Sequence, residues 1–362
     1  MSAVIEQSSL RLLFVSTPVG SLGSGEGGGV ELTLLNTVQV LAGRGYRVTV
    51  LAPLGSEVPN AQVIGVEGQG QVPAQTQTRI TPIVMPPQSV LANLWQCAHA
   101  MQSDYDLIVN FAYDWLPFFL TPFFHTPVAH LVSMGSLTDA MDAAIAAVAH
   151  RYPARIGVYT RTQAETFAFA DRCVLLGSGL DLSRYDFCET PDAGLAWLGR
   201  ISPEKGLEDA VAAAEATELP LKILGRIQDS DYFEQIQRQF PQAPIEYLGF
   251  LPTAEMQAVL RRCRALLVTS RWVEAFGNVL IEALACGVPV IAYRRGGPAE
   301  IVRHGETGWL VEPDSVAGLI KGIQTLSHID RWACRSQAEA EFSLEALGDR
   351  TEAWFTTLLH HK

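Results

Sequence analysis

The sequence predicts an α/β protein of two parallel-sheet domains, and three observations lead to this prediction. The chain has 362 residues, 48% of them hydrophobic, which is enough to bury two cores. Short β-branched and leucine-rich runs alternate with longer helical patterns, as in βαβ units. The alternation breaks once, at residues 186–192, where turn-forming and charged residues show no periodicity. We therefore expect a linker there, between an N-terminal domain of residues 1–188 and a C-terminal domain of residues 189–343.

The expected elements follow these runs in chain order. In the N-terminal domain we expect one glycine-rich loop and a helix at 30–43, with strands at 12–16, 47–52, 107–110, 128–132, 157–160 and 173–176. In the second domain we expect strands at 194–198, 221–224, 245–248, 265–269 and 288–292, and helices at 208–215, 231–239, 253–261 and 278–286. Ligands of open α/β sheets bind beyond the carboxyl ends of the strands, so the candidate residues should lie in the loops after the strands.

The charge of the chain excludes several classes of partner. A net charge of -12 and a pI near 5.1 would repel nucleic acid, whose binding relies on lysine and arginine. Residues 1–190 contain no lysine, so this half lacks a basic amphipathic helix and we expect no stable membrane association. The first ten residues have no signal-peptide pattern, and we expect a cytoplasmic location. The six cysteines form no C-x-x-C pair and have no histidine at zinc-ligand spacing, which predicts reduced core cysteines: Cys97, Cys173, Cys188, Cys263, Cys286 and Cys334.

The most informative stretch of the sequence is residues 270–302. A loop with Glu274 follows a predicted strand, and a helix begins near Asn278 after the Phe276-Gly277 turn. The start of a helix offers free N–H groups and the positive end of the dipole, and a glycine lets a phosphate come close. Glu282 lies about one turn inside this helix, where a carboxylate can bind the vicinal hydroxyls of a ribose. The alternative interpretation of either glutamate is an ordinary helix charge that favours the dipole.

A second set of candidates is the segment LGRISPEKGL. Arg200 directly follows a predicted strand, and Lys205 comes five residues later, before the next helix. Two cations at a strand end can hold a pyrophosphate, because each charge-assisted hydrogen bond contributes roughly 1.5 to 3 kcal/mol. The alternative is a pair of surface cations in a βα loop.

The glycine-rich loop at residues 20–31 contains G-x-G-x-x-G at Gly23, Gly25 and Gly28. A nicotinamide dinucleotide site is a weak match, because the glycines come late after the strand and the second strand ends without an acidic residue for the ribose. We interpret the segment as a flexible loop whose Gly28 and Gly29 amides approach a ligand. A mobile surface loop without a ligand is the alternative.

Taken together, these motifs resemble the retaining GT-B glycosyltransferases of family 4. The resemblance rests on the following residues, spread over nearly the whole chain: Arg200 with Lys205, Glu274 and Glu282 in an E-x7-E pattern, Gly277, Gly287-Val-Pro289-Val, Gly296-Gly-Pro-Ala-Glu300, Gly28 to Glu31 and Gly179-Leu-Asp181. It implies a GT-B fold, in which two Rossmann-like α/β domains face each other across a cleft. It also implies that a C-terminal helix at 344–362 packs back on the N-terminal domain.

The resemblance also implies roles for the site residues. Arg200 and Lys205 would neutralise the leaving diphosphate, and Glu282 would bind the ribose hydroxyls. Glu274 would contact the donor sugar, while the phosphates would meet the amides of Phe276, Gly277, Asn278 and Val279. Such an enzyme retains the anomeric configuration and needs no metal or other cofactor, because arginine, lysine and the helix dipole supply the positive charge.

The N-terminal domain departs from the family pattern at one position. Many relatives have a histidine where this chain has Asn110, whereas His130 aligns with the acceptor-side histidine of the family. The resemblance assigns His130 to the sugar or acceptor, and the alternative is a structural histidine in the core.

The expected acceptor is a small soluble molecule. The aromatic run at 114–125 could stack a flat heteroaromatic acceptor, although such runs are also common in cores. Within the family the chain looks most like bacterial UDP-glucose:tetrahydrobiopterin glucosyltransferases, which implies UDP-glucose as donor and a reduced pterin as acceptor. The alternatives are a nucleotide-sugar epimerase or hydrolase of the same architecture and a non-catalytic nucleotide-sugar-binding protein. The sequence leaves the base, the sugar, the extent of interdomain closure and the oligomeric state open.

Overall fold

The computed structural model describes residues 10–71 and 74–360 and divides into two compact units. Unit 1 is Met1–Ser178 with Leu344–Lys362, and unit 2 is Gly179–Ser343. The boundary therefore lies earlier in the chain than the expected 188/189. The reason is that the segment after Ser178 is hydrogen-bonded within unit 2: the Leu180 amide donates to the Phe342 carbonyl at 2.7 Å. A loss of periodicity marks a linker but does not say to which unit the linker is bonded.

The sheet of unit 1 has seven strands in the order β3-β2-β1-β4-β5-β6-β7, and all its pairs are parallel. The strands are β1 (Arg11–Val15), β2 (Arg47–Pro53), β3 (Gln62–Val66), β4 (Leu107–Asn110), β5 (Val128–Leu131), β6 (Ile156–Val158) and β7 (Cys173–Leu175). The central strands are buried on both faces, which explains their continuous apolar runs. The edge strand β3 is only partly buried, and it was not predicted.

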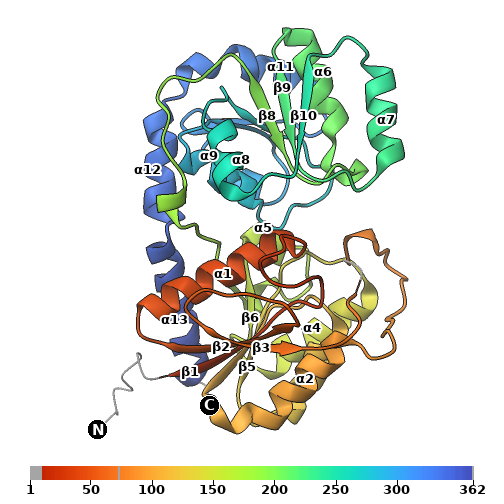
Figure 1. Ribbon diagram of the computed structural model, residues 1–362, viewed down its shortest axis with the longest axis vertical. Helices are drawn as coiled ribbons and strands as arrows, with labels where there is room; N and C mark the ends of the chain where they lie inside the picture. The colour runs from red at the N-terminus through yellow and green to blue at the C-terminus, as the bar shows by residue number, and fades with distance from the viewer. Residues whose placement is uncertain (1–9, 72–73, 361–362) are drawn as a thin grey trace. The chain divides into compact units, whose positions relative to one another are not determined.

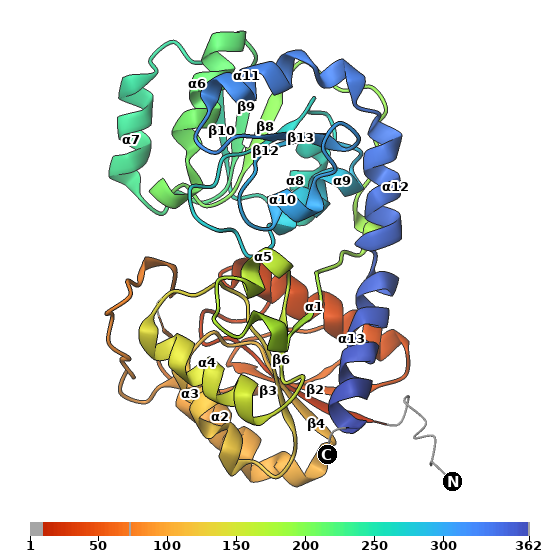
Figure 2. The ribbon, with the colours of Figure 1, turned by 180° about the vertical axis from the view of Figure 1, so that it is seen from behind.

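Helices cover both faces of this sheet (Figures 1 and 2). They are α1 (Gly28–Gly43), α2 (Val90–Met101), α3 (Trp115–Leu120), α4 (Asp139–Arg151), α5 (Arg161–Ala164) and α13 (Leu344–His360). The C-terminal helix α13 packs beside α1 on one face, while α2, α3 and α4 pack on the other. None of the helices in the described part of the chain has the length and apolar composition needed to cross a membrane.

The sheet of unit 2 has six strands in the order β10-β9-β8-β11-β12-β13, again all parallel. The strands are β8 (Leu195–Leu198), β9 (Leu221–Leu224), β10 (Ile245–Gly249), β11 (Leu266–Val268), β12 (Val290–Tyr293) and β13 (Gly308–Val311). The helices are α6 (Leu207–Thr217), α7 (Ser230–Gln239), α8 (Thr253–Leu260), α9 (Asn278–Ala285), α10 (Pro298–Ile301), α11 (Val316–Gln324) and α12 (Arg331–Glu341).

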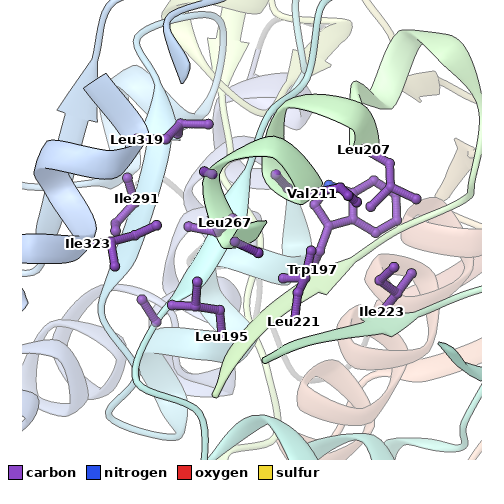
Figure 3. Close-up of a cluster of buried hydrophobic side chains, with 14 of the residues drawn as sticks. Leu195, Trp197, Leu207, Val211, Leu221, Ile223, Leu267, Ile291, Leu319 and Ile323 are labelled. Atoms are coloured by element: carbon purple, nitrogen blue, oxygen red, sulfur yellow. The ribbon is translucent and has the colours of Figure 1, made fainter. Parts of the chain in front are cut away.

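The core of unit 2 joins the sheet to α6, α7 and α11 (Figure 3). Trp197, Leu267 and Ile291 from three strands pack against Val211 of α6 and Ile323 of α11 in this cluster. On the opposite face α9 packs on β11 and β12, and α12 packs on α9. The two buried faces confirm the prediction of an α/β fold with parallel sheets.

The strand order reverses at one point in each sheet. In unit 1 it reverses between β1 and β4, and in unit 2 between β8 and β11. Connections on either side of such a point run to opposite faces of the sheet, so the strand-end loops part there and leave room for a ligand. Each unit therefore has its own candidate site at the carboxyl ends of these strands.

Candidate functional site

A lysine and a glutamate from two neighbouring strand ends form the centre of the site in unit 2. Lys205 ends the short 3-10 helix η7 (Pro203–Lys205) that follows β8, and Glu274 lies in the loop after β11. Because β8 and β11 are paired in parallel, both loops leave the same edge of the sheet. Nζ of Lys205 lies 2.5 Å from Oε2 of Glu274, and the side chains are 17% and 15% exposed. The structure thus brings two of the predicted residues together in one largely buried ion pair.

Further hydrogen bonds fix Glu274 through Oε2, the oxygen that contacts Lys205. Its Oε2 accepts hydrogen bonds from Ser270 Oγ at 3.2 Å and Trp272 Nε1 at 3.1 Å. The Lys205 ammonium lies 5.2 Å from the centre of the Trp272 ring, within cation–π distance. Burial raises the pKa of Glu274, but the Lys205 charge and the hydrogen bonds more than offset burial, so the pKa is below its usual value. The carboxylate is therefore ionised at neutral pH, with Oε1 left to accept from a ligand.

Two glycines keep the Glu274 loop in this position. A Cβ on Gly296 would lie 2.5 Å from the Glu274 carbonyl oxygen, and one on Gly297 would lie 2.3 Å from that of Phe276. The Gly297 amide donates to the Glu274 carbonyl at 2.7 Å, and Gly296 has a φ of 66°. No larger residue permits this approach of the two backbones. In the sequence this glycine pair is part of the family resemblance and has no assigned role. The structure shows that the pair allows the close approach of its backbone to the Glu274 loop.

Arg200 lies at the same sheet edge, directly after β8. Its guanidinium donates to the side-chain oxygen of Gln228 and lies 3.3 Å from Oε1 of Glu204. The Arg200 side chain is 33% exposed, and an ion pair at such a position is worth at most about 1 kcal/mol. A diphosphate could therefore replace these partners. Gln228, which comes from the loop after β9, was not among the predicted site residues.

The helix α9 begins beside this pair, as the sequence predicted. Gly277 precedes it with a φ of 92°, and a Cβ there would lie 2.3 Å from Leu280. The first turn, which contains Asn278 and Val279, has no acidic residue, so the positive end of the helix dipole is not neutralised by its own side chains. Phe276 is buried and packs edge-on against Phe342. These residues lie together at the helix start, and their contact with phosphate stays a prediction.

Glu282 lies further along α9 and is almost fully buried. Its Oε1 accepts a hydrogen bond from the Tyr185 hydroxyl at 3.0 Å. Burial raises the pKa of Glu282 to about 7, although this hydrogen bond and the charge of Arg184 act in the opposite direction. Sequence reasoning missed Tyr185, because it falls in the segment next to the expected linker and has no periodic neighbours.

The glycine-rich loop of unit 1 has an internal partner that the sequence did not reveal. The carboxylate of Glu31, in the first turn of α1, accepts hydrogen bonds from the amides of Gly23 at 2.6 Å, Gly25 at 3.2 Å and Gly27 at 3.0 Å. The amides that would bind a pyrophosphate in a dinucleotide site are thus bonded to the chain's own carboxylate. These hydrogen bonds agree with the weakness of the dinucleotide match and hold the loop to the start of α1.

Gly28 and Gly29 lie beyond this carboxylate, at the start of α1. A Cβ on Gly28 would meet nothing within 4 Å, but the φ of Gly28 is 59°. The position is therefore open in space and demands glycine for its backbone conformation. The role of the Gly28 and Gly29 amides as donors to a ligand stays a prediction.

His130 lies in the core of unit 1, which corrects its assignment to the sugar or acceptor. The residue is completely buried on β5 and stacks on Phe118. Its Nδ1 lies 3.1 Å from Asn110 Nδ2, and its Nε2 lies 2.8 Å from Thr121 Oγ1. Burial lowers the pKa of His130 to about 3, so the ring is neutral. With both ring nitrogens bonded inside the core, His130 cannot reach a substrate. In the described residues, no group of three or more His, Cys, Asp or Glu is arranged to hold a metal ion.

Comparisons with known proteins indicate the class of protein to which unit 2 and the fold are similar. Residues 191–340 match the model of the family described as glycosyl transferases group 1. These residues make up most of unit 2.

Individual relatives agree with this class. Over 162 residues the chain is 31% identical to a glycogen synthase of Mycobacterium tuberculosis, covering 42% of this chain and 39% of the relative. Over 132 residues it is 36% identical to the 2-deoxystreptamine N-acetyl-D-glucosaminyltransferase of Niallia circulans, covering 34% and 33%. The chain therefore spans well under half the length of these curated relatives.

Solved structures match over nearly the whole chain. The Anabaena protein HepE, solved with UDP and glucose, has a TM-score of 0.76 at 18% identity, covering 96% of this chain and 100% of HepE. Sucrose-phosphate synthase from Thermosynechococcus elongatus has a TM-score of 0.79 at 20% identity, covering 98% and 100%. The chain therefore has the GT-B fold that the resemblance implied.

Proposed function

We propose that this protein is a glycosyltransferase that moves a hexose from a nucleotide diphosphate sugar to a hydroxyl of a small acceptor, with retention of the anomeric configuration. The observation that carries the proposal is the Lys205–Glu274 pair at the strand-end edge of unit 2, beside the start of α9. A cation, a fixed carboxylate and the start of a helix at one edge match the three parts of a sugar diphosphate: its charge, its hydroxyls and its phosphate oxygens.

In the proposed complex each of these residues has one task. Arg200 and Lys205 neutralise the charge that develops on the leaving diphosphate, and the amides from Phe276 to Val279 bind its oxygens. Glu274 accepts from the hydroxyls of the donor sugar through Oε1, because its Oε2 is held by Lys205, Ser270 and Trp272. Glu282 accepts from the ribose hydroxyls. The positive charge comes from these side chains and the helix dipole, so the proposed reaction uses no metal.

The proposed reaction exchanges one bond at the anomeric carbon. The bond from this carbon to the diphosphate oxygen breaks, and the acceptor oxygen forms its bond on the same face of the sugar. The acceptor proton passes to the departing diphosphate, which is the nearest base on that face. His130 takes no part, since it is enclosed in the core of unit 1.

UDP-glucose is the proposed donor and a reduced pterin such as tetrahydrobiopterin the proposed acceptor. The Anabaena structure with UDP and glucose supports the donor, because its fold is shared over nearly all of this chain. The aromatic run of unit 1 supports a flat acceptor: Trp115 and Phe119 stack at 4.4 Å, and Phe119 and Phe123 are 49% and 62% exposed. Exposed rings of this kind are not needed for a core.

The test is release of UDP from UDP-glucose by the purified protein in the presence of EDTA, with and without a panel of small acceptors. We expect release that depends on an acceptor and is greatest with a reduced pterin. Equal release without any acceptor would favour a hydrolase, and tight UDP binding without release would favour a non-catalytic binding protein. Brisk transfer to simple sugars or phenols would overturn the pterin acceptor alone.

A further inference from the structure

Tyr185 stands out among the residues that the proposed reaction does not use. It is 3% exposed and lies in the segment that enters unit 2, far in sequence from α9. Its hydroxyl donates a hydrogen bond to Oε1 of Glu282 at 3.0 Å. A phenol that donates to a buried carboxylate fixes the orientation of that carboxylate.

The position of Tyr185 relative to α9 is itself fixed by α12. Nη1 of Arg335 donates to the Tyr185 carbonyl at 2.8 Å and to the Ala285 carbonyl at the end of α9 at 2.6 Å. Arg331 donates in addition to the Cys188 carbonyl at 2.6 Å. One guanidinium thus joins the main chain of Tyr185 to the helix that carries Glu282. The tyrosine ring and the carboxylate cannot drift apart without breaking these bonds.

The helix α9 also ends in a way that fixes its own position. The Gly287 amide donates to the Leu284 carbonyl at 2.9 Å and the Val288 amide to the Ala283 carbonyl at 2.8 Å, which is a Schellman motif. Gly287 has a φ of 73°, and a Cβ there would lie 2.5 Å from the Phe187 ring, two residues after Tyr185. The end of α9 and the Tyr185 segment are therefore packed directly against each other.

We propose that Tyr185 is a positioning residue, which orients the Glu282 carboxylate and favours its charged form by donating to Oε1, so that Oε2 can accept from the ribose of the nucleotide sugar. The inference rests on the proposed function, because it takes Glu282 as the ribose ligand. Tyr185 touches no substrate in this arrangement and acts only through Glu282.

The electrostatic surroundings of Glu282 agree with this role. Burial raises its pKa to about 7, and the Tyr185 hydroxyl and the Arg184 charge partly offset the effect of burial. Removal of the hydroxyl would leave the carboxyl protonated to a higher pH, and a protonated carboxyl is a poorer acceptor for two hydroxyls. The other titratable or charged groups on α9 and on the elements packed against it are Cys286 at the end of α9, Glu255 on α8 and Arg261 at its end, Glu300 on α10, Tyr293 on β12, and Arg331, Cys334, Arg335, Glu339 and Glu341 on α12.

The experiment measures UDP binding by titration calorimetry between about pH 6 and about pH 9. The variants are Tyr185→Phe, which keeps the ring, and the control Tyr46→Phe, which removes another buried tyrosine–glutamate contact, to Glu352 in unit 1. We expect Tyr185→Phe to raise the Kd for UDP about five-fold near pH 7, the factor that corresponds to one ordinary hydrogen bond. Near pH 9 the difference should shrink to less than about two-fold, and Tyr46→Phe should match the wild type throughout.

The outcomes separate this inference from the proposed function. An equal loss of affinity at every pH would mean that the hydroxyl acts through packing, and an unchanged Kd would mean that it has no role; either result overturns the inference and leaves the proposed function standing. Absence of UDP binding by the wild type would overturn both.

A second measurement needs no ligand. In the carboxyl ¹³C spectrum, the Glu282 signal is identified by its absence in Glu282→Gln. We expect it to titrate near pH 7 in the wild type and at a higher pH in Tyr185→Phe. The same midpoint in both proteins would contradict the proposed positioning.

Discussion

The two sheets are built in the same way, but the loops at their strand-end edges carry side chains of opposite charge. Both sheets are parallel and reverse their strand order beside the first strand. At the edge of unit 1 the carboxylate of Glu31 takes the amides of three glycines from its own loop. At the edge of unit 2 the start of α9 has no acidic residue in its first turn, and Arg200 and Lys205 lie in the neighbouring loop.

The difference shows that glycines and a helix start do not by themselves make an anion site. Free amides attract a carboxylate from any source, and the chain supplies one in unit 1. In unit 2 the carboxylate of Glu274, in the loop before α9, is bound by Lys205 instead. The two edges should therefore respond differently when their charges are removed.

The largest effect is expected for Lys205→Ala in unit 2. Loss of this ammonium removes a preorganised donor for the leaving diphosphate and should lower turnover of UDP-glucose by roughly two to three orders of magnitude. Arg200→Ala should act in the same direction and on the same scale. The control is Lys321→Ala on the exposed face of α11. Steady-state rates close to the wild type in both site variants would show that the diphosphate does not bind at this edge.

In unit 1 the corresponding change is Glu31→Ala, which should make the folded protein less stable. The variant loses a carboxylate that accepts three amide hydrogen bonds, and we expect the free energy of unfolding to fall by about 3 kcal/mol. Glu26→Ala removes an exposed carboxylate from the same loop and serves as control. Chemical denaturation checks the difference, and equal midpoints for the two variants would mean that Glu31 does not organise the loop.

Glu282→Gln should make the protein more stable at high pH while weakening nucleotide binding. The folded-state pKa of Glu282 is raised to about 7, so the wild type takes up a proton on folding and loses stability as the pH rises from the unfolded pKa near 4.3 through about 7. Glutamine avoids this loss and keeps an acceptor for Tyr185. We expect a gain of at most about 3.5 kcal/mol near pH 8 that falls to about 1 kcal/mol near pH 5.

Denaturant unfolding at the two pH values measures this gain. Glu255→Gln, at an exposed position on α8, is the control and should show no such pH dependence. A gain for Glu282→Gln that is the same at both pH values would contradict the assigned titration.

The smallest effect concerns the glycines that support Glu274. Gly296→Ala and Gly249→Ala both place a side chain at a positive φ, but only the first brings a Cβ within 2.5 Å of a neighbouring backbone. Gly296→Ala should therefore lower the free energy of unfolding by about 2 kcal/mol more than Gly249→Ala. Thermal unfolding compares them, and equal losses would mean that the loop can shift to admit the methyl group.

The fold and the centre of the unit 2 site could be predicted because local patterns carry them. Apolar runs gave the central strands, and the strand-end positions of Arg200, Glu274 and Gly277 placed them at one edge. The edge strands β3 and β13 (Gly308–Val311) were not predicted. A glycine, which is depleted in strands, interrupts the run VIGV of β3 and begins the run GWLV of β13.

The contacts that sequence could not supply join residues far apart in the chain. Tyr185 meets Glu282, and His130 meets Asn110 and Thr121, only because elements separated in the chain pack together in the fold. The resemblance carried a role over to His130, but the burial of its ring depends on packing that no spacing reveals. Glu31 was missed for another reason, because its partners are main-chain amides of nearby residues and leave no mark in residue types.

The proposed function requires that the strand-end edge of unit 2 binds the nucleotide diphosphate. Hydrogen–deuterium exchange of the wild type, with and without UDP and in the presence of EDTA, measures this binding segment by segment. We expect slower exchange at residues 200–206 and 274–282 when UDP is added. Unchanged exchange in both segments, with protection elsewhere in the chain, would contradict it.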